Sequence, residues 1–180
     1  VMPETKFLAE ARALCDRFDV VLVFDEVISF RVGYSGVQGV VGLRPDLTTL
    51  GKIIGGGFAV GAVAGRADIL DLSAPERGGR VTHAGTFNAN PLSAAAGITM
   101  LNIASTGEAQ ENASRTGYKL IGEMNKAISQ LGIEGSCVYG DGPLFHILLG
   151  KGACVNSDGT LVQGSADILT LRQGNAPEVK

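Results

Sequence analysis

The sequence has few residues of the kinds that hold metal ions. Its 180 residues include two histidines and three cysteines, Cys15, Cys137 and Cys154, which form no Cys-x-x-Cys pair. Structural zinc sites need clustered cysteines and histidines at short, regular spacings. The sequence therefore argues against a metal site. Three scattered cysteines also fit a reducing, cytoplasmic setting better than an oxidising one.

Several other patterns are missing, and each absence excludes a class of function. Basic and acidic residues number 15 and 18, with no run of Lys and Arg, which argues against a nucleic-acid partner. No apolar run is long enough to span a bilayer, and no signal peptide is visible. Neither a Walker A loop nor a Gly-x-Gly-x-x-Gly fingerprint after a strand occurs. We expect a globular protein without a membrane or nucleic-acid partner.

Glycine is the residue in excess. It supplies 26 of the 180 positions, about twice the average usage of roughly 7%. Glycine without a collagen repeat indicates tight turns and close backbone approaches. The chain opens on Val1 and stops at Lys180 within a polar segment. We interpret it as a piece of a longer protein.

The hydrophobic pattern predicts an α/β fold. Residues 3–18 have the spacing of an amphipathic helix, and the β-branched run 20–24 is typical of a parallel strand buried on both faces. The tail from Gly150 is predicted to be loop-like. The remaining predicted elements are strands over 47–50 and 59–64, helices over 67–72, 91–104 and 107–131, and strands over 136–139 and 144–149.

Asp25 ends the first predicted strand. In open α/β sheets, ligands bind at the carboxyl ends of the strands. A carboxylate at such a place is costly unless it meets a cation or hydrogen-bond donors. Asp25 is therefore a candidate ligand-binding residue. An equally good interpretation is that it caps the next turn or pairs with Arg31, which is itself a candidate for binding a substrate carboxylate.

Lys52 follows the second predicted strand and precedes three glycines, Gly55 to Gly57. Glycines allow a ligand to approach the backbone closely. A lysine amine in a partly desolvated pocket loses its proton readily and can then form an imine. The alternative is a solvated surface lysine beside a flexible turn. The residues taken alone favour that alternative.

The segment Gly85-Thr86 lies shortly before the predicted helix that opens at Pro91. A small hydroxyl beside a glycine near a helix start is a candidate anion cradle. A helix cap or an ordinary turn is the commoner use of such a segment. Both interpretations stay open on the residues alone.

In combination these motifs resemble those of one enzyme family. They are Phe24-Asp25-Glu26-Val27, Gly51-Lys52-Ile53-Ile54-Gly55-Gly56-Gly57, Val60-Gly61-Ala62 and His83-Ala84-Gly85-Thr86-Phe87-Asn88-Ala89-Asn90-Pro91. In this order they closely resemble the class III pyridoxal-phosphate aminotransferases, especially the branch that contains glutamate-1-semialdehyde 2,1-aminomutase. The resemblance covers roughly residues 1–150.

The resemblance implies a fold and a division into domains. It implies part of the fold-type I large domain, a mostly parallel sheet with flanking helices, followed by the start of a small α+β C-terminal domain. Residues 1–106 would form the second half of the cofactor-binding large domain. Residues 107–180 would form a connecting helix and the beginning of the C-terminal domain.

The resemblance also implies a cofactor, pyridoxal 5′-phosphate, and roles at the matching positions. Lys52 would bind the cofactor as a Schiff base and move the proton at the substrate carbon. Asp25 would pair with the pyridine nitrogen, and Val27 would pack against one face of the ring. Thr86 would bind the cofactor phosphate, usually across the dimer interface in this family. A homodimer with a shared active site is therefore expected.

The implied function is transamination of an amino acid, as a small-molecule substrate. Two departures from the aminomutase pattern lie near the site: the segment 27–31 is one residue shorter, and Gly-Thr-Phe-Asn-Ala-Asn-Pro replaces Gly-Thr-Leu-Ser-Gly-Asn-Pro. Both are more similar to aminotransferases acting on β-amino acids. One alternative is the aminomutase itself, forming 5-aminolevulinate. Another is a catalytically incompetent fragment, because the family's Ser-Gly-Ser/Thr-Glu-Ala phosphate cup does not occur in these residues.

Overall fold

The computed structural model describes residues 5–149, which form two compact units. The first unit ends at Asn112 and the second begins at Ala113. The loop-like tail predicted from Gly150 lies outside the described residues. The domain division predicted from the sequence, after residue 106, stays a prediction.

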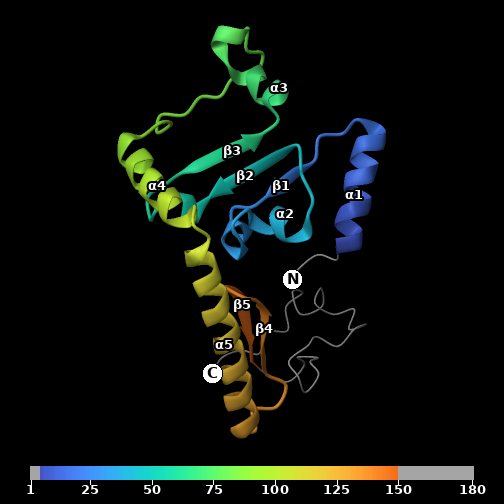
Figure 1. Cartoon of the computed structure of the whole chain (residues 1–180), viewed down its shortest axis with the longest axis vertical. Coiled ribbons are helices and arrows are strands. Elements are labelled where there is room, and N and C mark those ends of the chain that lie inside the picture. The colour runs from blue at the N-terminus through green and yellow to red at the C-terminus, as the bar shows by residue number, and fades with distance from the viewer. Residues whose placement is uncertain (1–4, 150–180) are drawn as a thin grey trace, which may run out of the picture. The chain divides into compact units, whose positions relative to one another are not determined.

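Each helix and strand predicted within the described range occurs (Figure 1). The α-helices are α1 (Thr5–Phe18), α2 (Gly36–Val41), α3 (Ala67–Leu70), α4 (Pro91–Ala104) and α5 (Glu108–Gln130). The 3-10 helices are η1 (Ser29–Val32), η2 (Lys52–Gly55), η3 (Asp71–Ser73) and η4 (Pro75–Arg77). The strands are β1 (Val23–Asp25), β2 (Leu47–Gly51), β3 (Gly61–Gly65), β4 (Cys137–Asp141) and β5 (Leu144–Leu148).

The first unit is built on a three-stranded sheet in the order β1-β2-β3 (Figure 1). Strands β1 and β2 are parallel, with Asp25 opposite Thr49. Strand β3 is antiparallel to β2. Parallel strands need a crossover connection, and α2 lies within the one that joins β1 to β2. Because β1 and β2 run the same way, Asp25 and Lys52 come to the same edge of the sheet.

The burial predicted for the first strand is wrong for the described chain. The strand is shorter than predicted, and Val20 and Val23 are 53% and 47% exposed. The physical reason is that, among the described strands, β1 pairs only with β2, so its other edge and much of its side-chain surface stay uncovered. The apolar run therefore predicted a strand correctly, but it did not predict the exposure of the strand's side chains in the described chain.

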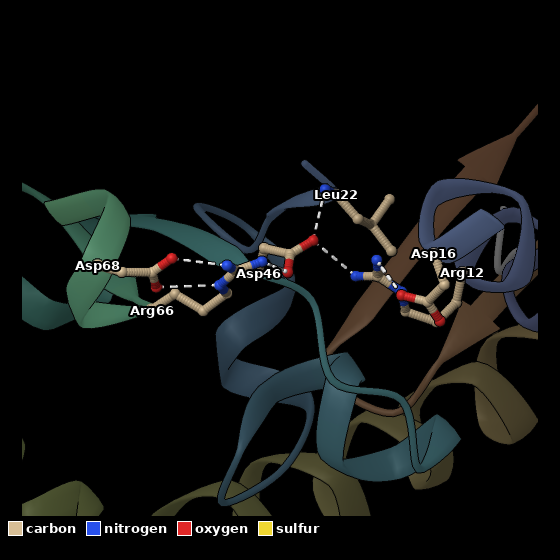
Figure 2. A network of polar contacts seen from close by, with 6 residues as sticks. All are labelled: Arg12, Asp16, Leu22, Asp46, Arg66 and Asp68. Carbon is tan, nitrogen blue, oxygen red and sulfur yellow. Dashed lines mark hydrogen bonds and ion pairs between the residues drawn. The ribbon is translucent and has the colours of Figure 1, made fainter. Parts of the chain in front are cut away.

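Asp46 lies at the end of the sheet where β2 begins, opposite to the end that carries Asp25 and Lys52. There it joins three parts of the first unit (Figure 2). Its Oδ2 accepts hydrogen bonds from Arg12 of α1 at 2.7 Å and from the Leu22 amide at 2.8 Å. Its Oδ1 accepts from Arg66, after β3, at 3.0 Å. The Arg12 bond first, then the Leu22 amide and Arg66, hold the pKa of Asp46 well below its usual range. This network fixes the end at which β2 begins.

Helix α4 begins where the sequence predicted, for a local reason. Asn90 caps it, since its side-chain oxygen accepts hydrogen bonds from the amides of Leu92 at 3.0 Å and Ser93 at 3.2 Å. Pro91 occupies the first turn, where its missing N–H costs nothing. The cap therefore belongs to Asn90 rather than to Thr86.

The second unit pairs the part of α5 beyond Asn112 with the hairpin of β4 and β5. Asn125 satisfies the backbone of β4: its Oδ1 accepts from the Val138 amide at 2.8 Å and its Nδ2 donates to the Val138 carbonyl at 2.7 Å. Gly117 lies so close to the turn that a Cβ there would be 1.9 Å from the Gly142 oxygen. Only glycine fits at this contact. None of the described helices combines the length and apolarity needed to cross a membrane.

Candidate functional site

The carboxyl ends of β1 and β2 bring the predicted site residues Asp25, Val27 and Lys52 to one edge of the sheet. Asp25 is the last residue of β1, and Lys52 follows the last residue of β2. Val27 contacts this edge through Gly51: a Cβ on Gly51 would lie 3.4 Å from Val27 Cγ1. A carboxylate, an amine and an apolar side chain therefore belong to residues at the edge where ligands bind in α/β sheets.

The Asp25 carboxylate is exposed and held through one oxygen. Oδ1 accepts hydrogen bonds from the Val27 amide at 3.0 Å and from Thr49 Oγ1 at 3.1 Å. The first of these bonds is the turn cap that the sequence allowed. Among the described residues, Oδ2 has no hydrogen-bond partner and no ion pair joins Asp25 to Arg31. One oxygen of Asp25 is thus left for a donor from a ligand.

Lys52 is exposed and has an uncommon backbone conformation. Its φ of 48° lies in the left-handed region, which side chains with a Cβ seldom adopt. Residues in such conformations cost about 1–3 kcal/mol and cluster at functional sites, where surrounding structure holds them. Here the turn η2 begins at Lys52 directly after β2. Lys52 is thus the non-glycine residue with a strained backbone in the connection between β2 and η2.

Helix α4 packs against the turn that follows Lys52. A Cβ on Gly97 of α4 would lie 3.1 Å from the Ile54 carbonyl oxygen, and one on Gly56 would lie 3.1 Å from the Ala96 oxygen. Ser93 of α4 also donates a hydrogen bond to the Ala59 carbonyl at 2.8 Å. The glycines beside Lys52 therefore admit a neighbouring helix, which supports the strained turn from behind.

Glu26 is a structural residue that sequence reasoning missed. It is 1% exposed, and its carboxylate accepts hydrogen bonds from the Gln38 amide at 2.8 Å, the Val37 amide at 3.1 Å and the Ser29 hydroxyl. It thereby caps the amino end of α2, where amide donors lack partners. A Cβ on Gly36 would lie 2.7 Å from Glu26 Oε1, so the glycine makes room for it.

The adjacent carboxylates Asp25 and Glu26 thus have different environments. Asp25 faces solvent with one free oxygen, whereas Glu26 is buried and paired with backbone donors. The available signal for Glu26 was indirect: an acidic residue after a strand, and a helix start about ten positions later. Glu26 fixes the turn that separates Asp25 from α2.

Thr86 is not brought to this edge by any contact of the described residues. It lies in an exposed turn in which the Asn88 amide donates to the Gly85 carbonyl at 3.0 Å. The next residue, Phe87, is 84% exposed. The structure therefore places Asp25, Val27 and Lys52 at one edge of the sheet and Thr86 in an exposed turn.

A cavity of about 580 Å³ lies on the face of the sheet opposite to the Thr49 side chain. Strand β2 contributes Thr48 and Leu50 to its lining, and these alternate with Thr49, whose hydroxyl reaches Asp25. None of Asp25, Val27, Lys52 or Thr86 lines it. This cavity is therefore distinct from the edge that the sequence singled out.

The donor set at the edge fits an aldehyde-bearing pyridine cofactor better than a metal ion. An exposed amine can bind a carbonyl carbon covalently. A carboxylate oxygen without a partner can accept the N–H of a protonated ring nitrogen. In the described part of the chain, no group of three or more His, Cys, Asp or Glu side chains could hold a metal ion.

The comparisons with known proteins agree on one family. The class-III aminotransferase family model matches residues 1–151. Glutamate-1-semialdehyde 2,1-aminomutase of Caldivirga maquilingensis is 42% identical over 135 residues, which cover 74% of this chain and 31% of that protein. The chain therefore spans less than a third of that relative's length.

Solved structures give the same result for the fold. A transaminase with PLP bound matches with a TM-score of 0.76 and 36% identity over 82% of this chain and 35% of that one. A β-phenylalanine aminotransferase from Variovorax paradoxus matches with a TM-score of 0.75 and 35% identity, covering 94% of this chain and 38% of that one. The α/β fold of a fold-type I PLP-dependent transaminase, predicted from the sequence, is confirmed.

Proposed function

Because the chain belongs to the class III aminotransferase family, we propose that the whole protein transfers amino groups from an amino-acid substrate with pyridoxal 5′-phosphate as cofactor. One observation carries the proposal to particular residues. Asp25 and Lys52 lie at the carboxyl ends of neighbouring parallel strands, exposed, with the free Asp25 oxygen at the same edge.

Lys52 is the residue that would hold the cofactor covalently, through its ε-amine. The same amine, once free, would move a proton at the substrate carbon that carries the amino group. The position of Lys52 directly after β2 and the strained backbone at the start of η2 support this role. The packing of α4 behind the turn would keep the amine in one place.

Asp25 would accept the ring N–H of the cofactor through Oδ2, and Val27 would pack against the ring. When bound, the protonated ring supplies an electron sink for negative charge at the substrate carbon. The role of Asp25 is to keep the ring nitrogen protonated, since its carboxylate stabilises the positive charge. The placement of Val27 beside Gly51 supports an apolar contact at this edge.

Thr86 would bind the cofactor phosphate in a partner subunit, so the working unit would be a homodimer with shared sites. Thr86 and the neighbouring Phe87 are exposed, which supports a contact of this segment with a second copy of the protein. A cytoplasmic location is part of the same proposal. It is supported by the odd number and wide spacing of the three cysteines in the sequence.

Glutamate-1-semialdehyde 2,1-aminomutase activity is the second candidate. The curated relatives of this name support it, at 42% identity for the Caldivirga protein. The sequence Gly85-Thr86-Phe87-Asn88 and the structural match to a β-phenylalanine aminotransferase favour transfer to a separate acceptor instead. The two candidates share the cofactor and differ in substrate.

The test is an assay of the full-length protein, saturated with cofactor. Amino donors, β-phenylalanine included, are offered with a 2-oxo acid, and glutamate-1-semialdehyde is offered separately without an acceptor. We expect transfer from a donor to the 2-oxo acid. Formation of 5-aminolevulinate alone would replace the first candidate with the second, and turnover of neither would contradict both. Residues 1–180 alone, assayed in parallel, are expected to be inactive.

A further inference from the structure

Two adjacent threonines of β2 face opposite sides of the sheet. The Thr49 hydroxyl donates a hydrogen bond to Asp25 Oδ1 at 3.1 Å. The Thr48 side chain is buried and accepts a hydrogen bond from Gln38 Nε2 at 3.3 Å, on the side that lines the cavity. Alternation along a strand produces this division. Only one of the two hydroxyls therefore touches the proposed cofactor site.

Thr49 is tied to β1 through both its backbone and its side chain. Its carbonyl accepts a hydrogen bond from the Glu26 amide at 2.9 Å, and its position in the register is directly opposite Asp25. The hydroxyl thus approaches Asp25 from a strand whose position is already fixed. A donor held in this way costs little further ordering when it binds the carboxylate.

The two hydrogen bonds to Asp25 end on the same oxygen. Oδ1 accepts hydrogen bonds from the Val27 amide, in the turn after β1, and from the Thr49 hydroxyl, within β2. Two donors on one oxygen oppose rotation of the carboxylate about its last side-chain bond. Hydrogen bonds to a charged group are stronger than those between neutral groups. The arrangement leaves Oδ2 open in a fixed direction.

We propose that Thr49 is a positioning residue, whose hydroxyl orients Asp25 so that Oδ2 stays free for the ring nitrogen of the cofactor. The inference rests on the proposed function, since it assumes that Asp25 meets a pyridine nitrogen. Thr49 acts only through Asp25 and touches no reacting atom. Its contribution is therefore to the binding of a ring that carries a nitrogen.

The test compares three variants of the full-length protein, prepared free of cofactor. Thr49→Val removes the hydroxyl and keeps the branched shape of the side chain, and Thr49→Ser keeps the hydroxyl. Thr48→Val is the matched control, since it removes the neighbouring hydroxyl on the other face. Equilibrium affinity is measured for pyridoxal phosphate and for its analogue with carbon in place of the ring nitrogen. Melting temperatures establish that each variant is folded.

For pyridoxal phosphate, we expect Thr49→Val to weaken binding about tenfold, the order expected for a lost hydrogen bond to a charged group. Thr49→Ser and Thr48→Val should bind as the unaltered protein does. For the carbon analogue, Thr49→Val should lose nothing, because no ring nitrogen is present for Asp25 to meet.

Three results would overturn the positioning role. They are an equal loss of affinity for both ligands, an equal loss in Thr48→Val, or an equal loss in Thr49→Ser. Failure of the unaltered protein to bind pyridoxal phosphate at all would instead contradict the proposed function. The two failures are therefore distinguishable within one set of measurements.

Discussion

The two ends of β2 have opposite chemical character. Before the strand begins, Asp46 accepts three hydrogen bonds and its side chain is 11% exposed. After the strand ends, Lys52 is exposed and the neighbouring Asp25 keeps a free oxygen. The same five-residue strand thus joins a polar network centred on Asp46 to an edge with unused binding groups.

The difference indicates a division between support and reactivity. Arg12 and Arg66 reach Asp46 from α1 and from the end of β3, so the network connects three elements (Figure 2). Asp46 is held by donors on both of its oxygens, so its carboxylate acts as a structural support. At the other end of β2, the turns next to Asp25 and Lys52 are fixed by Glu26 and by α4, whereas the two side chains themselves are exposed. Substitutions at the two edges should therefore affect different properties.

The largest effect is expected at the open edge, for Lys52→Ala in the full-length protein. Loss of the amine would remove the proposed proton-transfer group, and general acid–base catalysis alone contributes about 10²–10⁴-fold to a rate. We expect kcat to fall by at least this order while the melting temperature changes little. Lys52→Arg is the control for charge and should be equally slow. Full turnover by Lys52→Ala would disprove the role of this residue.

The next largest effect, a loss of stability, is expected for Glu26→Gln. This substitution alters the carboxylate that fixes the turn between Asp25 and α2. An amide in place of the buried carboxylate weakens the bonds from the Val37 and Gln38 amides. A buried donor left without its partner costs about 1–3 kcal/mol. The free energy of unfolding should fall by this order in denaturant titrations.

The neighbouring substitution Asp25→Asn is the matched control for Glu26→Gln. Because Asp25 is exposed, it should leave stability nearly unchanged and weaken cofactor binding. If Asp25→Asn destabilised the protein as much as Glu26→Gln does, the contrast between the two carboxylates would be wrong.

A smaller loss of stability is expected for Asp46→Asn, at the end where β2 begins. Arg12 keeps Asp16 as a partner at 2.6 Å and Arg66 keeps Asp68 at 2.6 Å, so neither cation is left alone. The melting temperature should fall at neutral pH, and the affinity for pyridoxal phosphate should stay unchanged. A large loss of affinity at unchanged melting temperature would reverse the comparison.

The same carboxylate should make stability depend on acid pH. The pKa of Asp46 is lowered in the folded state, chiefly by Arg12, so its contribution is complete above the unfolded-state pKa. That contribution is lost as pH falls from the ordinary aspartate range toward the lower folded-state pKa. Thermal unfolding between neutral and acid pH should therefore show a smaller decline in Asp46→Asn than in the unaltered protein.

The smallest effect is expected for Asp68→Ala. Asp68 bonds to Arg66 but its side chain is 64% exposed, and exposed ion pairs contribute little. The melting temperature should change by no more than the error of the measurement, and added salt should remove any difference. If Asp68→Ala lowered the melting temperature as much as Asp46→Asn does, Asp68 would contribute as much to the network as Asp46, and the account of the network would be wrong.

Local pattern predicted much of this structure. The Asn90-Pro91 start of α4 and the strand before Lys52 are readable from neighbouring residues, because caps and strand runs are local signals. The end of the first strand at Asp25 followed from the abrupt stop of its apolar run. Those inferences needed no knowledge of packing.

The remaining features depend on contacts between residues far apart in sequence. Glu26 finds its donors eleven and twelve positions later, and Asp46 finds Arg12 thirty-four positions earlier. The choice of Thr49 rather than Thr48 as the partner of Asp25 depends on strand register. No local pattern encodes these pairings, which is why sequence reasoning missed them.

The central claim is that the carboxyl edge of the sheet holds the cofactor through Lys52. The most direct measurement is borohydride reduction of the full-length protein loaded with pyridoxal phosphate, followed by proteolysis and mass mapping of the modified lysine. The account predicts that the reduced cofactor is attached to Lys52. Attachment to another lysine, with Lys52 unmodified, would contradict it.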